Sequence, residues 1–522
     1  MRHVATLALI AAVGLTASCG STVQYSGTAQ VGGTSGDGLG TAAGGQQGGA
    51  TGDLLGGTSG SATGGSAGAG STSGTSGQVL GGSASSTGSS GSSGGAPVPS
   101  AGVPGAGPAS GPGFTATTIK IGIATSSDYN TFASSTGLKG VGFDGDPNNW
   151  YAAVAGDINR HGGILGRKVE LVAHDFNTEQ TLTNPAAANQ AACTDWVQDH
   201  HVFAVVGPPI VEDTLLNCMR SAKTPIVQIG AGLDYPLHYA EAYAKNPLYF
   251  NLAQIDGDRF DKVAITRLVA RHYFDPWNTR TGSPGTAAAN PMRFGIVSFN
   301  DHDGDLQLAS LEKQLKAHGL KATSTVACPR SLSDKVACEQ SAVLKFASGG
   351  ITHVMNSDST FMNAASSQGY YPRHFLPIEP ALFAANVPAK ELAGAMGEGY
   401  IPFDDTPADK YPGDPTPATG ACKKVMKAAG QASTDPTTLI AQLSICDGFY
   451  FLRSALQAAG ALGADALRAG LEGLGSKVPS ALTYETFLGP RNHASAGAVR
   501  DLLYDSGIQN FVYTSKTDYR AA

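Results

Sequence analysis

Polar and acidic side chains follow several stretches of this sequence that are typical of buried β-strands. Residues 118–124 place Ile at every second position without a charge near the end, and Asp128, Tyr129 and Asn130 come directly after them. Because ligands of open parallel sheets bind beyond the carboxyl ends of the strands, the residues after each strand are the candidate contacts. They are Asp128, Tyr129, Asn130, Ile210, Val211, Ala231, Gly232, Asp303, Asp358 and Glu379.

The acidic members of this set leave two interpretations open. If Asp303, Asp358 and Glu379 face a binding cleft, they favour a cationic or hydroxyl-rich ligand. Alternatively they cap helices, as aspartates ahead of a helix commonly do. Residues 301–305 (DHDGD) carry oxygen-bearing side chains at alternate positions, but the glutamate at position 12 of a calcium loop is missing, so no metal is predicted. No other cofactor is predicted.

Catalysis is not predicted either. Residues 64–68 (GGSAG) formally match the nucleophile elbow of serine hydrolases, but no strand precedes them and no helix follows in this Gly- and Ser-rich stretch. The chain also has no H-E-x-x-H zinc motif. We therefore expect a binding protein rather than an enzyme.

The elements that must position these residues repeat one pattern. Residues 150–159 carry apolar side chains at helical spacing, and residues 168–173 begin a second strand after the glycines at 162 and 163. Strand, helix and strand recur over residues 201–229, and the pattern restarts at residue 294. Strands separated by helices predict an α/β fold with parallel sheets.

The first fifth of the chain does not have the composition of a folded domain. Residues 1–18 have a short basic start, an apolar core and small residues before Cys19, which is typical of a secretory signal. Residues 15–19 (LTASC) resemble a bacterial lipobox, so we expect lipidation of Cys19; the alternative is an ordinary signal cleaved nearby. Residues 20–114 are almost entirely small or polar, and about 94 such residues span roughly 50–60 Å as a flexible tether.

Charge and cysteine content agree with an exported protein. The net charge of −7 without a basic run argues against a nucleic-acid partner. Excluding Cys19, six cysteines remain, and an even number on an exported chain favours disulfides. Nearest-neighbour pairing is one of 15 possibilities, with free buried thiols as the alternative; it would join Cys193 to Cys218, Cys328 to Cys338 and Cys422 to Cys446.

Residues 157–171 (DINRHGGILGRKVEL) resemble the signature of type I solute-binding proteins of ABC transporters, the leucine/isoleucine/valine-binding family. Further similar segments follow in order: VFAVVGP at 202–208, TPIVQIG at 224–230, RFGIVSFN at 293–300 and GITHVMNSD at 350–358. The resemblance implies two Rossmann-like lobes joined by three hinge crossings, near Leu252, Pro402 and Tyr484. The lobes would comprise residues 115–251 with 403–483, and 252–402 with 484–522.

The same resemblance implies a function. The chain would capture a small solute by hinge closure outside the cell membrane, to which its lipid anchor holds it, and deliver the solute to an ABC permease. An extracellular ligand-sensing module without transport is the alternative. Residues 208–211 (PPIV) replace the serine-rich turn of amino-acid binders and Asp303 replaces a tyrosine. The ligand is therefore left as an amino acid or a related polar metabolite.

Overall fold

The computed structural model describes residues 110–135, 142–209, 211, 213–229, 240–329, 332–376, 384–402, 414–514 and 519–520. The predicted signal, Cys19 and nearly all of the predicted tether lie outside these residues. Within the described part, no helix is both long and apolar enough to cross a membrane.

The first sheet confirms the parallel strand–helix–strand pattern. Its strand order is β2-β1-β3-β4-β5, with every pair parallel. The strands are β1 (Thr118–Thr125), β2 (Lys168–Asp175), β3 (Ala204–Val206), β4 (Ile226–Gln228) and β5 (Tyr249–Asn251). The helices between them are α2 (Tyr129–Ser135), α3 (Pro147–Arg160), α4 (Thr178–Thr183), α5 (Pro185–Cys193), the π-helix η1 (Thr194–Asp199), α6 (Asp213–Ala222) and α7 (Ala240–Lys245).

The turn after α3 depends on glycine. Gly162 and Gly163 both have positive φ, and a Cβ on Gly163 would lie 2.0 Å from the backbone oxygen of Arg167. This close approach lets the chain reverse directly into β2. Residues 185–199 form two successive helices, since α5 passes into η1 at Thr194.

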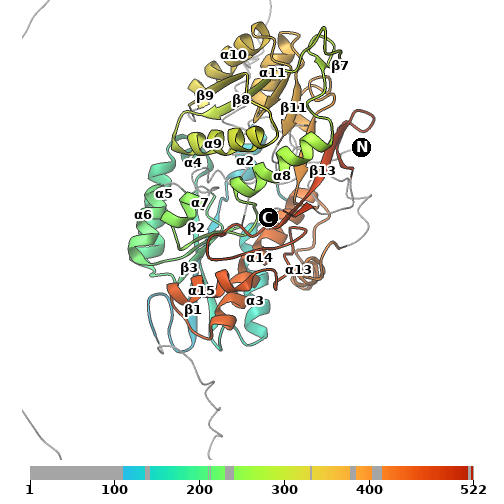
Figure 1. Ribbon diagram of the computed structural model, residues 1–522. Helices are drawn as coiled ribbons and strands as arrows, with labels where there is room; N and C mark the ends of the chain where they lie inside the picture. Colours follow the sequence, from blue (N-terminus) through green and yellow to red (C-terminus); the bar gives the residue numbers. More distant parts are fainter. Residues whose placement is uncertain are drawn as a thin grey trace, which may run out of the picture. The chain divides into compact units, whose positions relative to one another are not determined.

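The second sheet is mixed, in the order β14-β13-β12-β11-β10-β8-β9, with β15 paired to β13. Figure 1 shows α9 and α10 beside β8 and β9. The elements leading into and through this sheet are α8 (Gly257–Ala270), β8 (Phe294–Phe299), α9 (His302–Ala317), β9 (Ser324–Cys328), α10 (Leu332–Ser348), β10 (His353–Met355), α11 (Ser359–Ser367), β11 (Arg373–Leu376) and β12 (Met396–Gly399). Between α8 and β8 the chain forms a small hairpin of β6 (Trp277–Asn278) and β7 (Ser283–Pro284).

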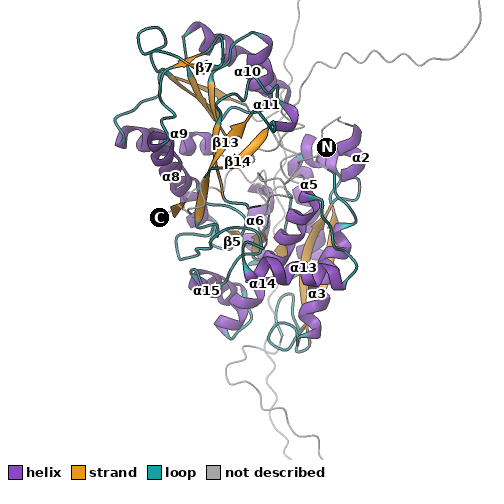
Figure 2. Ribbon diagram, turned by 90° about the vertical axis from the view of Figure 1, so that its right-hand side faces the viewer, coloured by secondary structure: helices purple, strands orange, loops and turns teal. Residues whose placement is uncertain are grey.

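After β12 the chain adds three helices beside the first sheet and then returns to the second sheet. The helices after β12 are α13 (Pro417–Ala428), α14 (Pro436–Ala459) and α15 (Ala464–Leu474), and α15 was not predicted. Figure 2 shows α13 and α14 beside α3, which they contact, and α14 also contacts β3 and β4. The last strands, β13 (Ala498–Asp505), β14 (Asn510–Tyr513) and β15 (Tyr519–Arg520), complete the second sheet with antiparallel pairs.

The chain therefore passes three times between the two sheets, after β5, after β12 and after α15. We call β1–β5 with their helices and α13–α15 the first lobe, and the elements of the second sheet the second lobe. One apolar core, which includes Val154, Phe449 and Phe294, runs through residues of both. The residue limits given above for the lobes stay a prediction.

Candidate ligand-binding site

Asp128 joins the loops that follow β1 and β2. Its carboxylate accepts hydrogen bonds from the hydroxyls of Ser126 (3.0 Å) and Thr178 (2.6 Å) and from the side-chain amide of Asn177 (2.9 Å). It also accepts the backbone N–H of Thr178 at the start of α4. Four internal donors already use this carboxylate, so its evident task is to hold the two loops together; ligand contact by Asp128 stays a prediction.

Asp175 is a second carboxylate at the same edge, and it was not predicted. It ends β2, opposite Thr125 at the end of β1. Its oxygens accept hydrogen bonds from the backbone N–H (2.8 Å) and the hydroxyl (2.5 Å) of Ser127. Asp175 and Ser127 are both exposed. The signal for it was its place at the end of the strand that residues 168–173 were predicted to begin.

Tyr129 and Asn130 have structural partners in the first lobe. Tyr129 is 2 % exposed and its ring centroid lies 5.2 Å from that of Phe143. The side-chain amide of Asn130 donates to the carbonyl of Phe143 (3.0 Å), and its oxygen accepts the N–H of Phe143 (2.8 Å). These two residues hold the segment ahead of α3 in place, and no described contact presents either of them to a ligand.

The other first-lobe candidates are only partly described. Val211 is fully buried in a core cluster, so its side chain packs rather than faces an opening. Ile210, Ala231 and Gly232 lie outside the described residues, as does Glu379 of the second lobe.

Asp301 lies directly ahead of α9, and Asp303 lies in the first turn of that helix. Asp301 is the N-cap and accepts the N–H of Gly304 at 2.9 Å. A Cβ on Gly304 would lie 2.0 Å from the backbone oxygen of Phe299, so glycine lets α9 begin directly against the end of β8. Asp303 is 9 % exposed. Its position at the carboxyl end of β8 agrees with the predicted edge, although ligand contact stays a prediction.

Asp358 lies in a buried charged cluster that was not predicted. The carboxylate caps α11 by accepting the N–H groups of Thr360 (2.8 Å) and Phe361 (3.1 Å). The ammonium group of Lys335 lies 2.5 Å from Asp358 and 3.9 Å from Glu339. Lys335 and Glu339 are four residues apart on α10, a spacing that places them on one face of the helix.

The pKa values of the two carboxyl groups in this cluster shift in opposite directions. Burial acts to raise the pKa of Asp358, but Lys335 and hydrogen bonds from its neighbours outweigh burial and lower it. Burial, together with the charge of Asp358, holds the pKa of Glu339 well above its usual value. Asp358, paired with Lys335, is therefore the more readily ionised of the two carboxyl groups.

Ser357, next to Asp358, begins a chain of buried hydrogen bonds. Its hydroxyl lies 2.7 Å from Nδ1 of His374, whose Nε2 lies 2.7 Å from the carboxylate of Glu391. The three residues are 3 %, 0 % and 1 % exposed. Although Ser, His and Glu can form a catalytic triad, this hydroxyl is enclosed by protein, so the arrangement positions the loop after β10.

A small hollow lies at the opposite edge of the first sheet. Its lining includes Leu216 and Met219 of α6, with Ile226 and Tyr249 at the starts of β4 and β5. Because parallel sheets bind ligands at the carboxyl edge, this hollow is not assigned as the site. Among the residues that the structure describes, no three His, Cys, Asp or Glu side chains are arranged to hold a metal ion.

Comparisons with known proteins agree with this arrangement. A family model described as "Periplasmic binding protein" matches residues 148–500. No curated protein matches the chain.

Several solved structures resemble this chain over almost the whole length of the solved protein. A solute-binding protein of an ABC transporter from R. palustris, in complex with 4-hydroxybenzoate, is 13 % identical with a TM-score of 0.53, covering 77 % of this chain and 97 % of its own. A branched-chain amino acid ABC transporter protein from Thermus thermophilus with bound valine is 13 % identical with a TM-score of 0.50, covering 77 % and 97 %. A substrate-binding protein from Aeropyrum pernix is 10 % identical with a TM-score of 0.55, covering 78 % and 96 %.

The family match covers more than half of the chain, and the fold has one parallel and one mixed sheet with the three crossings expected from the sequence. The chain therefore belongs to the periplasmic binding protein family, the type I solute-binding proteins of ABC transporters.

Proposed function

We propose that this protein is the substrate-binding component of an ABC importer, tethered outside the cell membrane through a lipidated Cys19. It captures a small solute, an amino acid or a related polar metabolite, as its two lobes close. The lobes we propose are residues 115–251 with 403–483 and residues 252–402 with 484–522. The observation that carries the proposal is the threefold passage of the chain between two sheets, within a family match over residues 148–500.

Hydrogen bonds connect the three crossings to one another. Arg259 at the start of α8, after the first crossing, donates hydrogen bonds to Asn492 (3.0 Å) and to the carbonyl of Ala494 (2.9 Å) in the third. It also pairs with Asp256. Tyr484 of the third crossing donates its N–H to the carbonyl of Tyr400 in the second (3.4 Å). These contacts couple the three crossings, which favours a concerted closure.

The carboxyl edge of the first sheet favours a ligand with hydrogen-bond donors. Ser127 and Asp175 are exposed there, and a carboxylate prefers an ammonium or hydroxyl partner. We propose that they contact the ligand together with the predicted residues of the neighbouring loops, including those outside the described part. Because similar solved structures hold 4-hydroxybenzoate and valine, aromatic acids and branched-chain amino acids belong among the ligands to be tested.

A thermal-shift screen tests this proposal. The mature protein is heated with amino acids, polyamines, sugars and aromatic acids, and a true ligand at about 100 times its Kd stabilises the native state by about 2.7 kcal/mol. Asp175→Asn should reduce the shift, whereas Glu170→Gln, an exposed change on the same strand away from the carboxyl end, should not. A complete absence of shifts across the screen would contradict the proposal, and ligand-stimulated uptake would separate import from sensing.

A further inference from the structure

The last strand of the chain lies beside the third crossing, which we take as residues 484–497. This strand, β15, consists of Tyr519 and Arg520 and pairs antiparallel with Val499 and Ala498 at the start of β13. Those two residues of β13 follow directly on the third crossing. We call Tyr519 and Arg520 the strap, because both of their side chains continue onto neighbouring elements.

Tyr519 covers an ion pair between α8 and β13, which lie side by side in Figure 2. Its ring centroid lies 3.7 Å from the central guanidinium carbon of Arg267 on α8. Arg267 donates two hydrogen bonds, at 3.0 Å and 2.8 Å, to the carboxylate of Asp501 on β13. A guanidinium bound along its edge still offers its face to an aromatic ring. Tyr519 also packs against the apolar core that runs through both lobes, so it ties β13 to the helix that follows the first crossing.

Arg520 joins the strap to the third crossing itself. Its Nε donates to the carboxylate of Glu485 at 3.0 Å. The carbonyl of Glu485 accepts the N–H of Gly497, so the contact reaches both ends of the crossing. The side chain of Arg520 is 77 % exposed, and an exposed pair contributes little energy, so Tyr519 is the stronger attachment.

The residue before Glu485 is held by the second lobe as well. The guanidinium carbon of Arg500 on β13 lies 3.8 Å from the ring centroid of Tyr484. Tyr513 of β14 meets the same ring edge to face, with centroids 5.7 Å apart. Tyr484 donates its N–H to the carbonyl of Tyr400 in the second crossing. Strands β13, β14 and β15 therefore all contact the start of the third crossing.

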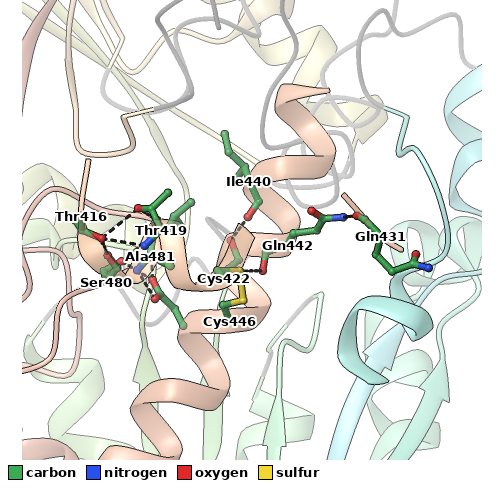
Figure 3. Close-up of a disulfide and its surroundings, with 12 residues drawn as sticks. Thr416, Thr419, Cys422, Gln431, Ile440, Gln442, Cys446, Ser480 and Ala481 are labelled. Atoms are coloured by element: carbon green, nitrogen blue, oxygen red, sulfur yellow. Dashed lines mark hydrogen bonds between the residues drawn. A yellow bond between two sulfur atoms is a disulfide. The ribbon is translucent and has the colours of Figure 1, made fainter. Parts of the chain in front are cut away.

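The residues just before the third crossing are fixed within the first lobe (Figure 3). Thr416, the N-cap of α13, donates to the carbonyl of Ser480 at 2.6 Å. Thr419 donates to the carbonyl of Ala481 at 2.8 Å. From α14, the carboxyl group of Asp447 accepts the N–H of Ala481 at 2.6 Å. Movement between the lobes therefore falls on the residues that follow, and these are the residues that the strap contacts.

We propose that the strap restrains the third crossing and thereby limits the relative movement of the two lobes. It contacts α8, which follows the first crossing, and Glu485 within the third, so it acts on two crossings at once. Because it is the last strand of the chain, it can detach without breaking any other strand pair. Its effect on ligand capture rests on the proposed hinge closure, but the restraint itself does not require a ligand.

Hydrogen–deuterium exchange of the ligand-free full chain measures this restraint. Removing residues 519–522 should raise the exchange rate of a peptide covering residues 484–497 by about three- to tenfold, because the local opening becomes easier. Peptides from α5 and α6 in the first lobe should exchange as in wild type. Unchanged exchange over 484–497 would overturn the proposal, whether or not any ligand is ever found. An equal increase in every peptide, or loss of the fold, would also overturn it.

Variants of Tyr519 isolate its contact with Arg267. Tyr519→Ala should reproduce most of the increase, whereas Tyr519→Phe keeps the ring and should retain the wild-type rate. Tyr371→Ala is the matched control, since the ring centroid of Tyr371 lies 3.7 Å from the ammonium group of Lys390, beside the β6–β7 hairpin. This control should leave residues 484–497 unchanged. A control or Tyr519→Phe protein that exchanges as fast as Tyr519→Ala would overturn the proposal.

A charge exchange tests the second contact of the strap. Arg520→Glu places two carboxylates together and should raise the exchange rate over residues 484–497 by about twofold. Adding Glu485→Arg restores opposite charges and should return the rate to that of wild type. A double variant that stays as fast as Arg520→Glu would contradict the pairing of the strap with the crossing.

Discussion

Lys335 is the residue on which the charged cluster of the second lobe depends. It is 8 % exposed and lies between Asp358 and Glu339, two carboxyl groups that are also largely enclosed. A buried ion pair adds little net stability compared with an apolar replacement of both partners, but removing one partner leaves an uncompensated charge. The cluster also caps α11, so it fixes the loop that carries Ser357 and Asp358 at the carboxyl edge of the sheet.

Replacing Lys335 by methionine should therefore destabilise the protein by about 3–5 kcal/mol, as broken buried pairs do. Urea unfolding followed by circular dichroism measures the loss. Lys313→Met, an exposed change on α9, should cost little. Adding Asp358→Asn to Lys335→Met should recover part of the loss, because Asp358 is the carboxyl group whose charge Lys335 compensates. Equal stability of Lys335→Met and wild type would contradict the assigned ion pair.

For individual residues, the sequence indicated that the acidic candidates lie at the carboxyl edges of the sheets, but it did not indicate which residues they pair with. The candidates Asp128, Asp303 and Asp358 were placed correctly after strands. The hydrogen bonds of Asp128 with Thr178, and the salt bridge of Asp358 with Lys335, join residues far apart in the chain or on another element. Strand periodicity contains no information about such partners.

Three disulfides each connect neighbouring elements. Cys193 and Cys218 join α5 to α6, Cys328 and Cys338 join β9 to α10, and Cys422 and Cys446 join α13 to α14, as nearest-neighbour pairing predicted. Each closes a short loop, so it restrains the unfolded chain and fixes the spacing of two packed elements.

The double variant Cys422→Ala/Cys446→Ala should lose about 3 kcal/mol of stability, the entropy expected for a loop of this length. The sequence separation is 24 residues. Denaturant unfolding measures the loss, and peptide mapping without reductant checks all three pairs beforehand. Free thiols or crossed pairs in the map would contradict the assignment, as would a double variant as stable as wild type.

The whole molecule combines a binding body with a predicted tether. If Cys19 is lipidated, the acyl chains hold the body at the membrane, since each buried CH2 contributes about 0.8 kcal/mol. Cys19→Ser should move the protein from the membrane fraction to the medium, whereas Ser21→Ala should leave it bound. Immunoblots of the two fractions measure this, and a Cys19→Ser protein that remains with the membrane would exclude the lipid anchor.

The sequence by itself determined the fold class. Alternating apolar residues at 118–124, helical spacing at 150–159 and the glycine turn between helix and strand depend on local periodicity, and β1, α3 and β2 appear where they were predicted. The order of the short motifs between residues 157 and 358 indicated the family. Each motif is a short run of neighbouring residues, so it can be recognised in the sequence without knowledge of the tertiary structure.

Tertiary structure alone decided which polar residues are used internally. Asp447 looks like any residue of an apolar helix until α13, α14 and residues 480–483 meet around it. Asp175 and Lys335 likewise acquire their roles through parallel register and helix packing. The physical reason is distance along the chain. Hydrophobic periodicity is a local property, whereas burial, pKa and hydrogen-bond partners depend on segments brought together from more than 20 residues away.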